Sequence, residues 1–270
     1  MDTSEIISKA LFTGGNRFKN TITCIERIAQ SCNAVFCEEG IRIFESNSKG
    51  TELFQFNIYR DSIRNYEYSH DEEEYYFPFD FIKLNTFVKQ IKKNYGVKLT
   101  LYKDKLNLQI ERLSNDFGGE LTVFPTEKTI KRIQPFYESP SDETILIDRA
   151  DEVGKVFGEV TPSSVKYVKF QCYDKHIVIR GYDNLCKNPL TNSKLGRESD
   201  STSKEPRDFN INASIIKSLS KIPNIAGDSD VEIILIDDHD NRGKVLCVHC
   251  NVGFLGNLTF YFRNDGGKEL

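Results

Sequence analysis

Lysine side chains recur on the outward faces of two predicted helices, a pattern suited to binding the phosphates of a polyanion. In residues 80–95 (DFIKLNTFVKQIKKNY) apolar residues follow Leu84 at i+3, i+4, i+7 and i+11, which is typical of one helix face. Residues 213–222 (ASIIKSLSKI) have a similar stripe, and 133 residues separate Ile82 from Ile215. At about 100° per residue, the lysines fall opposite these stripes: Lys89, Lys92 and Lys93 in the first segment, and Lys217 and Lys221 in the second.

A similar offset connects two further predicted helices. Residues 16–30 (NRFKNTITCIERIAQ) form an apolar stripe of Phe18, Ile22, Ile25 and Ala29, and residues 150–160 (ADEVGKVFGEV) begin 134 residues after Asn16. Gly154 and Gly158 weaken the second of these helices by about 1 kcal/mol each relative to alanine. Helix, strands, helix, strands therefore occur twice in order. This predicts two similar domains, with chance agreement between unrelated α+β domains as the alternative.

Charge is distributed unevenly along the chain. The formal net charge is −4, yet the segments 16–30, 80–95 and 213–222 carry +2, +3 and +2, and 149–160 carries −1, which leaves −10 elsewhere. A basic surface on an acidic protein predicts one nucleic-acid-facing side; ordinary solvated helix faces are the alternative. The candidate phosphate contacts are Arg17, Lys19, Arg27, Lys83, Lys89, Lys92, Lys93, Arg149, Lys155, Lys217 and Lys221.

Residues with catalytic chemistry do not assemble into a recognisable motif. Asp237, Asp238, His239 and Asp240 form the densest polar cluster, but a hairpin turn explains them more simply than a metal. Cys247, His249 and Cys250 lack the further ligands that a structural zinc site needs. We therefore expect a binding protein that is not an enzyme and needs no metal or cofactor. The odd total of 7 cysteines and the absence of a signal or membrane segment favour reduced thiols in a soluble intracellular protein.

Proline and apolar content predict the domain boundaries. Residues 126–142 follow Pro125 directly, contain Pro135 and Pro140, and have no sustained hydrophobic period. This is typical of an interdomain connector. We therefore predict an N-terminal domain at 1–125, a C-terminal domain at 143–264 and a tail at 265–270. Residues 184–207 are polar and poor in apolar residues, so we expect much of this segment to be mobile.

The closing segment GKVLCVHCNVGFLGNLTFYF carries the most specific motif, Gly256-Asn257-Leu258-Thr259-Phe260-Tyr261. It resembles the closing hairpin of the eukaryotic and archaeal sliding clamps, the proliferating cell nuclear antigen (PCNA) family. Gly40-Ile41-Arg42-Ile43 is similar to the Gly-Val-x-Leu strand of that family. The order of predicted elements agrees over nearly the whole chain, while similarity elsewhere is weak, which is typical of a divergent member, with a viral origin as one explanation.

This resemblance implies an α+β fold of two PCNA-like domains, each with two antiparallel sheets and two helices on the inner face. It implies a homotrimeric ring that encircles double-stranded DNA without sequence preference and is placed there by a clamp loader. DNA polymerase and other replication or repair proteins would be its partners, in the nucleus or in a viral replication compartment, with no membrane association. A monomeric or dimeric viral processivity factor, or a checkpoint-type subunit of a hetero-oligomeric ring, is the alternative.

The resemblance also implies a groove for partner peptides beside the connector. The matching positions are Ser46, Phe136, Tyr137, Pro140, Val245 and Tyr261. The family often has a methionine at the position of Ser46 and a proline near Val245, so this groove is expected to prefer a different peptide motif. Phe262-Arg263-Asn264 also replaces the Ala-Pro of the family. The ring would join an edge strand at 119–124 to one near 185–191, where Pro189 makes a poor strand.

Overall fold

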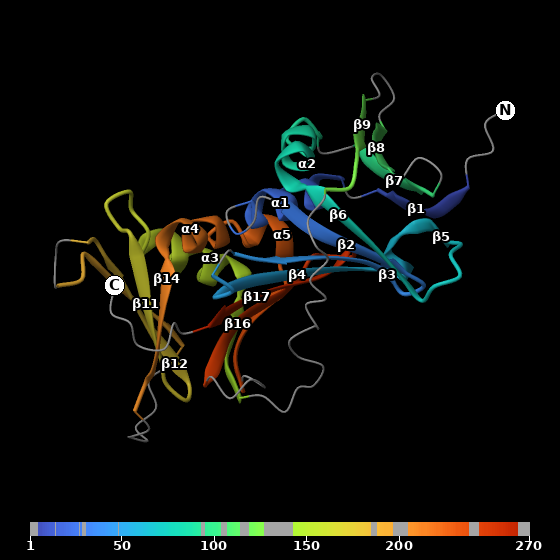
Figure 1. The fold of residues 1–270 in the computed structure, drawn as a ribbon. Helices are drawn as coiled ribbons and strands as arrows, with labels where there is room; N and C mark the ends of the chain where they lie inside the picture. The colour runs from blue at the N-terminus through green and yellow to red at the C-terminus, as the bar shows by residue number, and fades with distance from the viewer. Residues whose placement is uncertain are drawn as a thin grey trace. The chain divides into compact units, whose positions relative to one another are not determined.

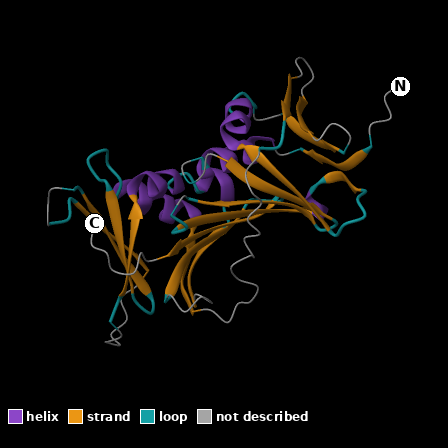
Figure 2. Cartoon of the chain, in the orientation of Figure 1, coloured by secondary structure: helices purple, strands orange, loops and turns teal. Residues whose placement is uncertain are grey.

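The computed structural model describes residues 5–13, 15–26, 28, 31–47, 49–92, 95–103, 107–113, 119–126, 143–184, 188–196, 205–237 and 243–263. The chain divides into two compact units (Figures 1 and 2). Unit 1 comprises Met1–Glu45, Gln55–Ile133 and Val252–Leu258, and unit 2 comprises Ser46–Phe54, Gln134–Asn251 and Thr259–Leu270. These units exchange short segments, whereas the predicted domains are continuous. The predicted tail and all of the connector except residue 126 lie outside the described residues.

Unit 1 is built on two sets of hydrogen-bonded strands. One set has the order β5-β1-β7-β8-β9 and the other the order β4-β3-β2-β6. The pairs β1–β7, β7–β8 and β2–β3 are antiparallel. The strand bounds are β1 Ile6–Phe12, β2 Ser31–Cys37, β3 Gly40–Ser46, β4 Glu52–Tyr59, β5 Arg64–Tyr68, β6 Glu74–Asp80, β7 Gly96–Tyr102, β8 Asn107–Leu113 and β9 Gly119–Val123. Its helices are α1 (Gly15–Ile25), α2 (Phe81–Val88) and a 3-10 turn, η1 (Arg60–Ser62).

Unit 2 has the same kind of construction. Its strands follow the orders β10-β15-β16-β17 and β13-β12-β11-β14. The pairs β10–β15, β15–β16 and β11–β12 are antiparallel. The strand bounds are β10 Glu143–Arg149, β11 Tyr167–Cys172, β12 His176–Tyr182, β13 Thr191–Gly196, β14 Arg207–Asn212, β15 Asp230–Asp237, β16 Lys244–Asn251 and β17 Gly256–Arg263. The helices are α3 (Ala150–Glu159), α4 (Ala213–Leu219) and α5 (Pro223–Ala226).

The two units repeat one topology. In each, the first strand leads into a helix: β1 precedes α1 and β10 precedes α3. The second helix then follows an edge strand, β6 before α2 and β14 before α4. The order β1-β7-β8-β9 corresponds to β10-β15-β16-β17, and β4-β3-β2-β6 corresponds to β13-β12-β11-β14. The duplication predicted from the helix offset is therefore confirmed, as is the α+β class.

Polar caps set where the second helix of each unit begins. The Asp80 carboxylate accepts hydrogen bonds from the amides of Ile82 (2.9 Å) and Lys83 (3.3 Å) at the start of α2. The Asn212 side chain accepts one from the amide of Ser214 (2.9 Å) at the start of α4. Both satisfy amides that have no partner within the helix. Each cap residue directly follows a strand, so the chain changes direction at the cap. This change of direction sets which face of the helix is buried.

All four predicted helices end earlier than predicted, and the difference is largest in unit 1. Helix α1 ends at Ile25 rather than at residue 30, and α2 ends at Val88 rather than at residue 95. After α2 the amides of Gln90 and Ile91 donate to the carbonyls of Phe87 (3.2 Å) and Val88 (2.9 Å), which is the tighter i→i+3 pattern. Ile91 remains buried in this turn. The apolar stripe therefore continues although the α-helix does not.

A strand forms within the segment that we expected to be largely mobile. Strand β13 pairs antiparallel with β12, from Thr191 opposite Gly181 to Gly196 opposite His176. Leu195 is buried, and the Leu190 amide donates to the Gly181 carbonyl (2.8 Å). Pro189 precedes this ladder, so its missing N–H costs the strand no hydrogen bond. The expectation for 184–207 was wrong over 191–196, because a neighbouring strand stabilises a polar sequence.

Candidate nucleic-acid interface and partner cleft

The predicted phosphate contacts of unit 1 lie on and after its two helices, which contact each other (Figure 1). Arg17 and Lys19 of α1 are half-buried, whereas Lys83 of α2 and the following Lys89 and Lys92 are exposed. Arg27 and Lys93 lie outside the described residues. The buried side of α2, including Leu84, Phe87 and Val88, is the predicted stripe, so its lysines face away from the core.

Some of these cations have contacts within the protein. The Lys19 ammonium donates to the Ile91 carbonyl (2.9 Å) and so satisfies an acceptor in the turn after α2. Lys89 pairs with Glu26 at 3.3 Å, and Lys83 approaches Asp80 at 3.9 Å. Exposed pairs of this kind contribute only about 0–1 kcal/mol, so Lys83 and Lys89 can exchange their carboxylates for phosphates. Lys19 has a structural role in addition.

The four predicted phosphate contacts of unit 2 are all exposed. Arg149 precedes α3 and pairs with Asp151 (2.9 Å), and Lys155 lies on α3 itself. That helix also carries Asp151, Glu152 and Glu159, which reduce its attraction for phosphate. Lys217 in α4 and Lys221 just after it lie one turn apart, opposite the buried Ile215 and Leu219. Helix α4 therefore presents the most uniformly positive face of unit 2.

The predicted peptide groove is described at three of its six positions, all in unit 2. Ser46 is half-buried, Val245 is buried in β16 and Tyr261 is 8% exposed in β17. Burial raises the pKa of the Tyr261 phenol, which stays protonated at neutral pH. Phe136, Tyr137 and Pro140 lie outside the described residues, so the complete groove stays a prediction.

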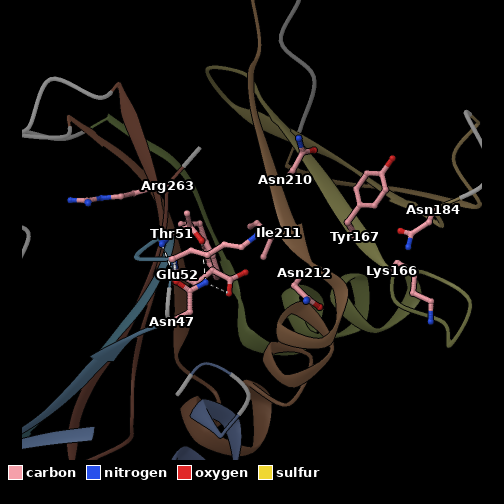
Figure 3. Close-up of a pocket in the computed structure, with 12 residues that line it drawn as sticks. Asn47, Thr51, Glu52, Lys166, Tyr167, Asn184, Asn210, Ile211, Asn212 and Arg263 are labelled. Atoms are coloured by element: carbon pink, nitrogen blue, oxygen red, sulfur yellow. Dashed lines mark hydrogen bonds between the residues drawn. The ribbon is translucent and has the colours of Figure 1, made fainter. Parts of the chain in front are cut away.

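A polar cavity of about 310 Å³ is lined in part by Asn47 and Phe262, which directly follow Ser46 and Tyr261 in the sequence (Figure 3). Figure 3 shows Asn47, Thr51 and Glu52 on one side, and Lys166, Tyr167 and Asn184 on the other. The lining residues are Asn47, Lys49, Thr51, Glu52, Lys166, Tyr167, Asn184, Asn210, Ile211, Asn212, Phe262 and Arg263. Three cations against one carboxylate give the lining a net positive charge. It is suited to polar or acidic groups of a peptide.

The Asn47 side chain organises one wall of this cavity. Its amide nitrogen donates to Thr51 Oγ1 (3.0 Å) and Glu52 Oε2 (2.8 Å), and its carbonyl accepts from the Thr51 amide (3.0 Å). This Asx-type turn holds the segment 47–52. Sequence reasoning missed the asparagines of the cavity. The available signal was Asn210 and Asn212 alternating at the end of a strand immediately before a basic helix.

Cysteine and metal chemistry are simple in the described parts of the chain. The six cysteines described there are buried and form no disulfide bond, and burial raises the pKa of Cys250 to about 12. Those same parts contain no group of three or more histidine, cysteine or acidic residues placed to hold a metal. Of the 237–240 cluster, residues 238–240 lie outside the description. None of the described helices has the length and hydropathy needed to cross a bilayer.

No family model matches the sequence, and comparison with curated proteins found no match. Among solved structures, the PCNA2–PCNA3 complex from Sulfolobus tokodaii is similar with a TM-score of 0.72 and 11% identity, covering 96% of this chain and 100% of that one. PCNA from Entamoeba histolytica gives a TM-score of 0.72 and 12% identity, covering 96% and 99%. At such low sequence identity, structural similarity establishes only the fold. This chain therefore has the PCNA-like sliding-clamp fold that its closing motif predicted.

Proposed function

We propose that this protein is a sliding clamp that encircles duplex DNA and tethers a DNA polymerase, without catalysing a reaction itself. The observation that carries the proposal is the pair of exposed basic segments at α2 and α4, which hold equivalent positions in the duplicated topology. Lysine ammonium groups attract phosphates without fixing register. Such contacts are sequence-independent and weaken with salt, which permits sliding.

The ring that we propose is a homotrimer joined through sheet edges. Strands β9 and β13 each have one neighbour among the described strands, β8 and β12 respectively. Pairing β9 of one copy with β13 of the next would extend both sheets and repeat head to tail until it closes. Glu120 on β9 and Lys194 on β13 offer opposite charges for this contact. The strand at 191–196 replaces the 185–191 segment that the sequence suggested.

The polar cavity, whose lining includes the sequence neighbours of Ser46 and Tyr261, supports a second role, the docking of partner peptides. Tethering in this way raises the effective concentration of polymerase at the primer end. The positive lining favours a peptide with an acidic or carboxamide anchor. A closed ring cannot thread onto DNA without free ends, so a clamp loader is part of the proposal. The protein would meet such partners in the nucleus or in a viral replication compartment.

Charge reversal tests the DNA-facing assignment. The variant Lys89→Glu/Lys92→Glu/Lys217→Glu/Lys221→Glu should abolish stimulation of polymerase on long primed templates while its circular dichroism spectrum stays unchanged. Four lost phosphate contacts in each subunit should also flatten the dependence of DNA affinity on salt. Lys175→Glu is the matched control, since Lys175 is exposed in the β11–β12 turn. Full stimulation by the four-site variant would show that these helices do not face DNA.

Light scattering tests the ring separately. A homotrimer has three times the 31.0 kDa mass of the chain. A single species at the chain mass, at micromolar concentration, would favour a monomeric processivity factor or a subunit that needs different partners. Lys194→Glu should reduce self-association, and the double variant Glu120→Lys/Lys194→Glu should restore it if the two strands meet. Equal association of the single and double variants would place the interface elsewhere.

A further inference from the structure

The turn between β16 and β17 presents an unusually exposed aromatic ring. Phe254 is 90% exposed, the highest value among the large apolar side chains that the structure describes. A solitary exposed apolar residue is ordinary and needs no explanation. The surroundings of this one are unusual, because a guanidinium from a basic helix lies against it.

Arg17 of α1 makes that contact within unit 1. Its guanidinium carbon lies 5.8 Å from the centroid of the Phe254 ring, within the range of a cation–π interaction. The same guanidinium occupies the space beside Gly253, where any Cβ would overlap it. Gly253 has a φ of +51°, which glycine adopts at little cost. Gly253 thus leaves space for the Arg17 guanidinium, and Phe254 places an aromatic ring beside it.

The turn itself is held firmly. The Val252 amide donates to the Gly256 carbonyl (2.8 Å), and the Leu255 amide donates to the Val252 carbonyl (2.9 Å). The Leu255 carbonyl in turn accepts from the Tyr59 amide (3.0 Å) and the Ser62 hydroxyl (2.8 Å). Val252 and Leu255 are buried. The turn therefore anchors its apolar neighbours in unit 1 and leaves the ring of Phe254 in solvent.

The local charge indicates the kind of ligand. Arg17 and Lys19 are the charged residues of α1, both positive, and residues 251–257 carry no charge. An aromatic face beside a guanidinium matches an unpaired nucleotide, whose base stacks on a ring while its phosphate meets a cation. An apolar peptide would need a wider apolar surface than one side chain. A base inside a duplex keeps its faces stacked on neighbours, so the ligand has to be single-stranded.

We propose that Phe254 and Arg17 form a stacking site for an unpaired base of single-stranded DNA. This site adds a contact with single-stranded DNA to the proposed clamp function. It rests on that function, because it assumes that the α1 side of unit 1 approaches DNA. A clamp with such a site would hold the single strand next to a primer end as well as encircle the duplex. Neither a closed ring nor a polymerase is needed to observe the contact.

Binding of the full-length protein to two labelled oligonucleotides tests the site by fluorescence anisotropy. One probe is an oligodeoxythymidine and the other an abasic strand of equal length and charge. The wild type should bind the thymidine strand about 5- to 150-fold more tightly, from the usual strength of one stacked base. Phe254→Ala should bring that preference close to unity and leave affinity for the abasic strand unchanged. Phe124→Ala, which removes another exposed ring of unit 1, should keep the preference.

The cation is tested with the same two probes. Arg17→Ala should weaken binding of both strands and lower the slope of log affinity against log salt by about 0.7 per lost phosphate contact. Arg64→Ala, an exposed arginine of the same unit, is the control. Gly253→Ala should likewise weaken binding of both strands with all charges retained, because its methyl group displaces the guanidinium.

Two results would overturn the stacking site. One is equal affinity of the wild type for the two strands. The other is a Phe254→Ala variant that keeps the thymidine preference; if that variant also loses polymerase stimulation, Phe254 contacts a protein instead. A failure of the proposed clamp function is distinguishable from these results. It would appear as unchanged polymerase stimulation by the lysine-reversal variant on long primed templates. It would not alter the relative affinity for the thymidine and abasic strands.

Discussion

The second helices of the two units begin alike and end differently. Both α2 and α4 follow an edge strand and start at a side-chain cap, Asp80 or Asn212. A cation from a distant segment then closes the end of α2, where Lys19 donates to the Ile91 carbonyl. After α4 the chain turns into α5, and the Pro223 ring packs where a Cβ on Gly154 of α3 would lie. The end of α2 is therefore stabilised by a charged side chain and the region after α4 by close packing. This leaves Lys217 of α4 and Lys221 after it available for other contacts.

The largest expected effect comes from the close packing in unit 2. Gly154→Ala should destabilise the protein by about 1–3 kcal/mol, because the new methyl group overlaps Pro223 and the Ser220 carbonyl. Gly158→Ala in the same helix is the matched control, since its Cβ would meet only Ser220 Cβ at 3.8 Å. It should stabilise by roughly 0.5–1 kcal/mol through helix propensity. Urea denaturation followed by circular dichroism measures both, and equal shifts would contradict the packing difference.

The corresponding test in unit 1 removes the cation. Lys19→Met should cost about 1 kcal/mol of stability, because the Ile91 carbonyl loses a charged donor while most of the aliphatic stem is retained. Lys221→Met should be close to neutral, since Lys221 is exposed after α4. Denaturation midpoints under identical conditions compare the two. A neutral Lys19→Met variant would remove the proposed asymmetry between the helix ends.

Substitutions at the N-termini of α2 and α4 should have more similar effects on stability than substitutions at their C-termini. Asp80→Ala and Asn212→Ala should each destabilise by about 0.5–2 kcal/mol, the usual range for a lost cap. Asp80 accepts from two amides and Asn212 from one, so the Asp80 variant should be the less stable of the two. Replacement of Asp80 by serine, which can also cap, should recover most of the loss. A larger effect at Asn212 would contradict the count of bonded amides.

The smallest expected effect is a pH dependence confined to unit 2. Burial lowers the pKa of His249, against an opposing contribution from Glu232, and the ring lies 2.8 Å from Thr259 Oγ1. The unfolded imidazole takes up a proton near its ordinary pKa of about 6.5. The contribution of His249 is therefore present above that pH and lost as the pH falls through the folded value. His249→Gln should flatten stability between about pH 8 and pH 5, measured by amide exchange in β16.

Local patterns in the sequence determined most of the fold. The apolar stripes identified which sides of the helices are buried. The repeated offset between the predicted helices identified the duplication. Each of these depends on residues within a few positions of one another. The basic helix faces were visible for the same reason, because a helix side is set by spacing alone.

Only the tertiary structure decided where elements end and what lies beside them. Ile91 stays on the buried stripe after α2 has stopped, and its carbonyl partner, Lys19, is 72 residues away. Strand β13 forms because β12 offers it a hydrogen-bonding ladder, and the asparagine-lined cavity joins segments from five parts of the chain. Arg17 meets Phe254 in the same way. Spacing predicts which side of an element is buried, but hydrogen-bond partners and close contacts come from residues that only folding brings together.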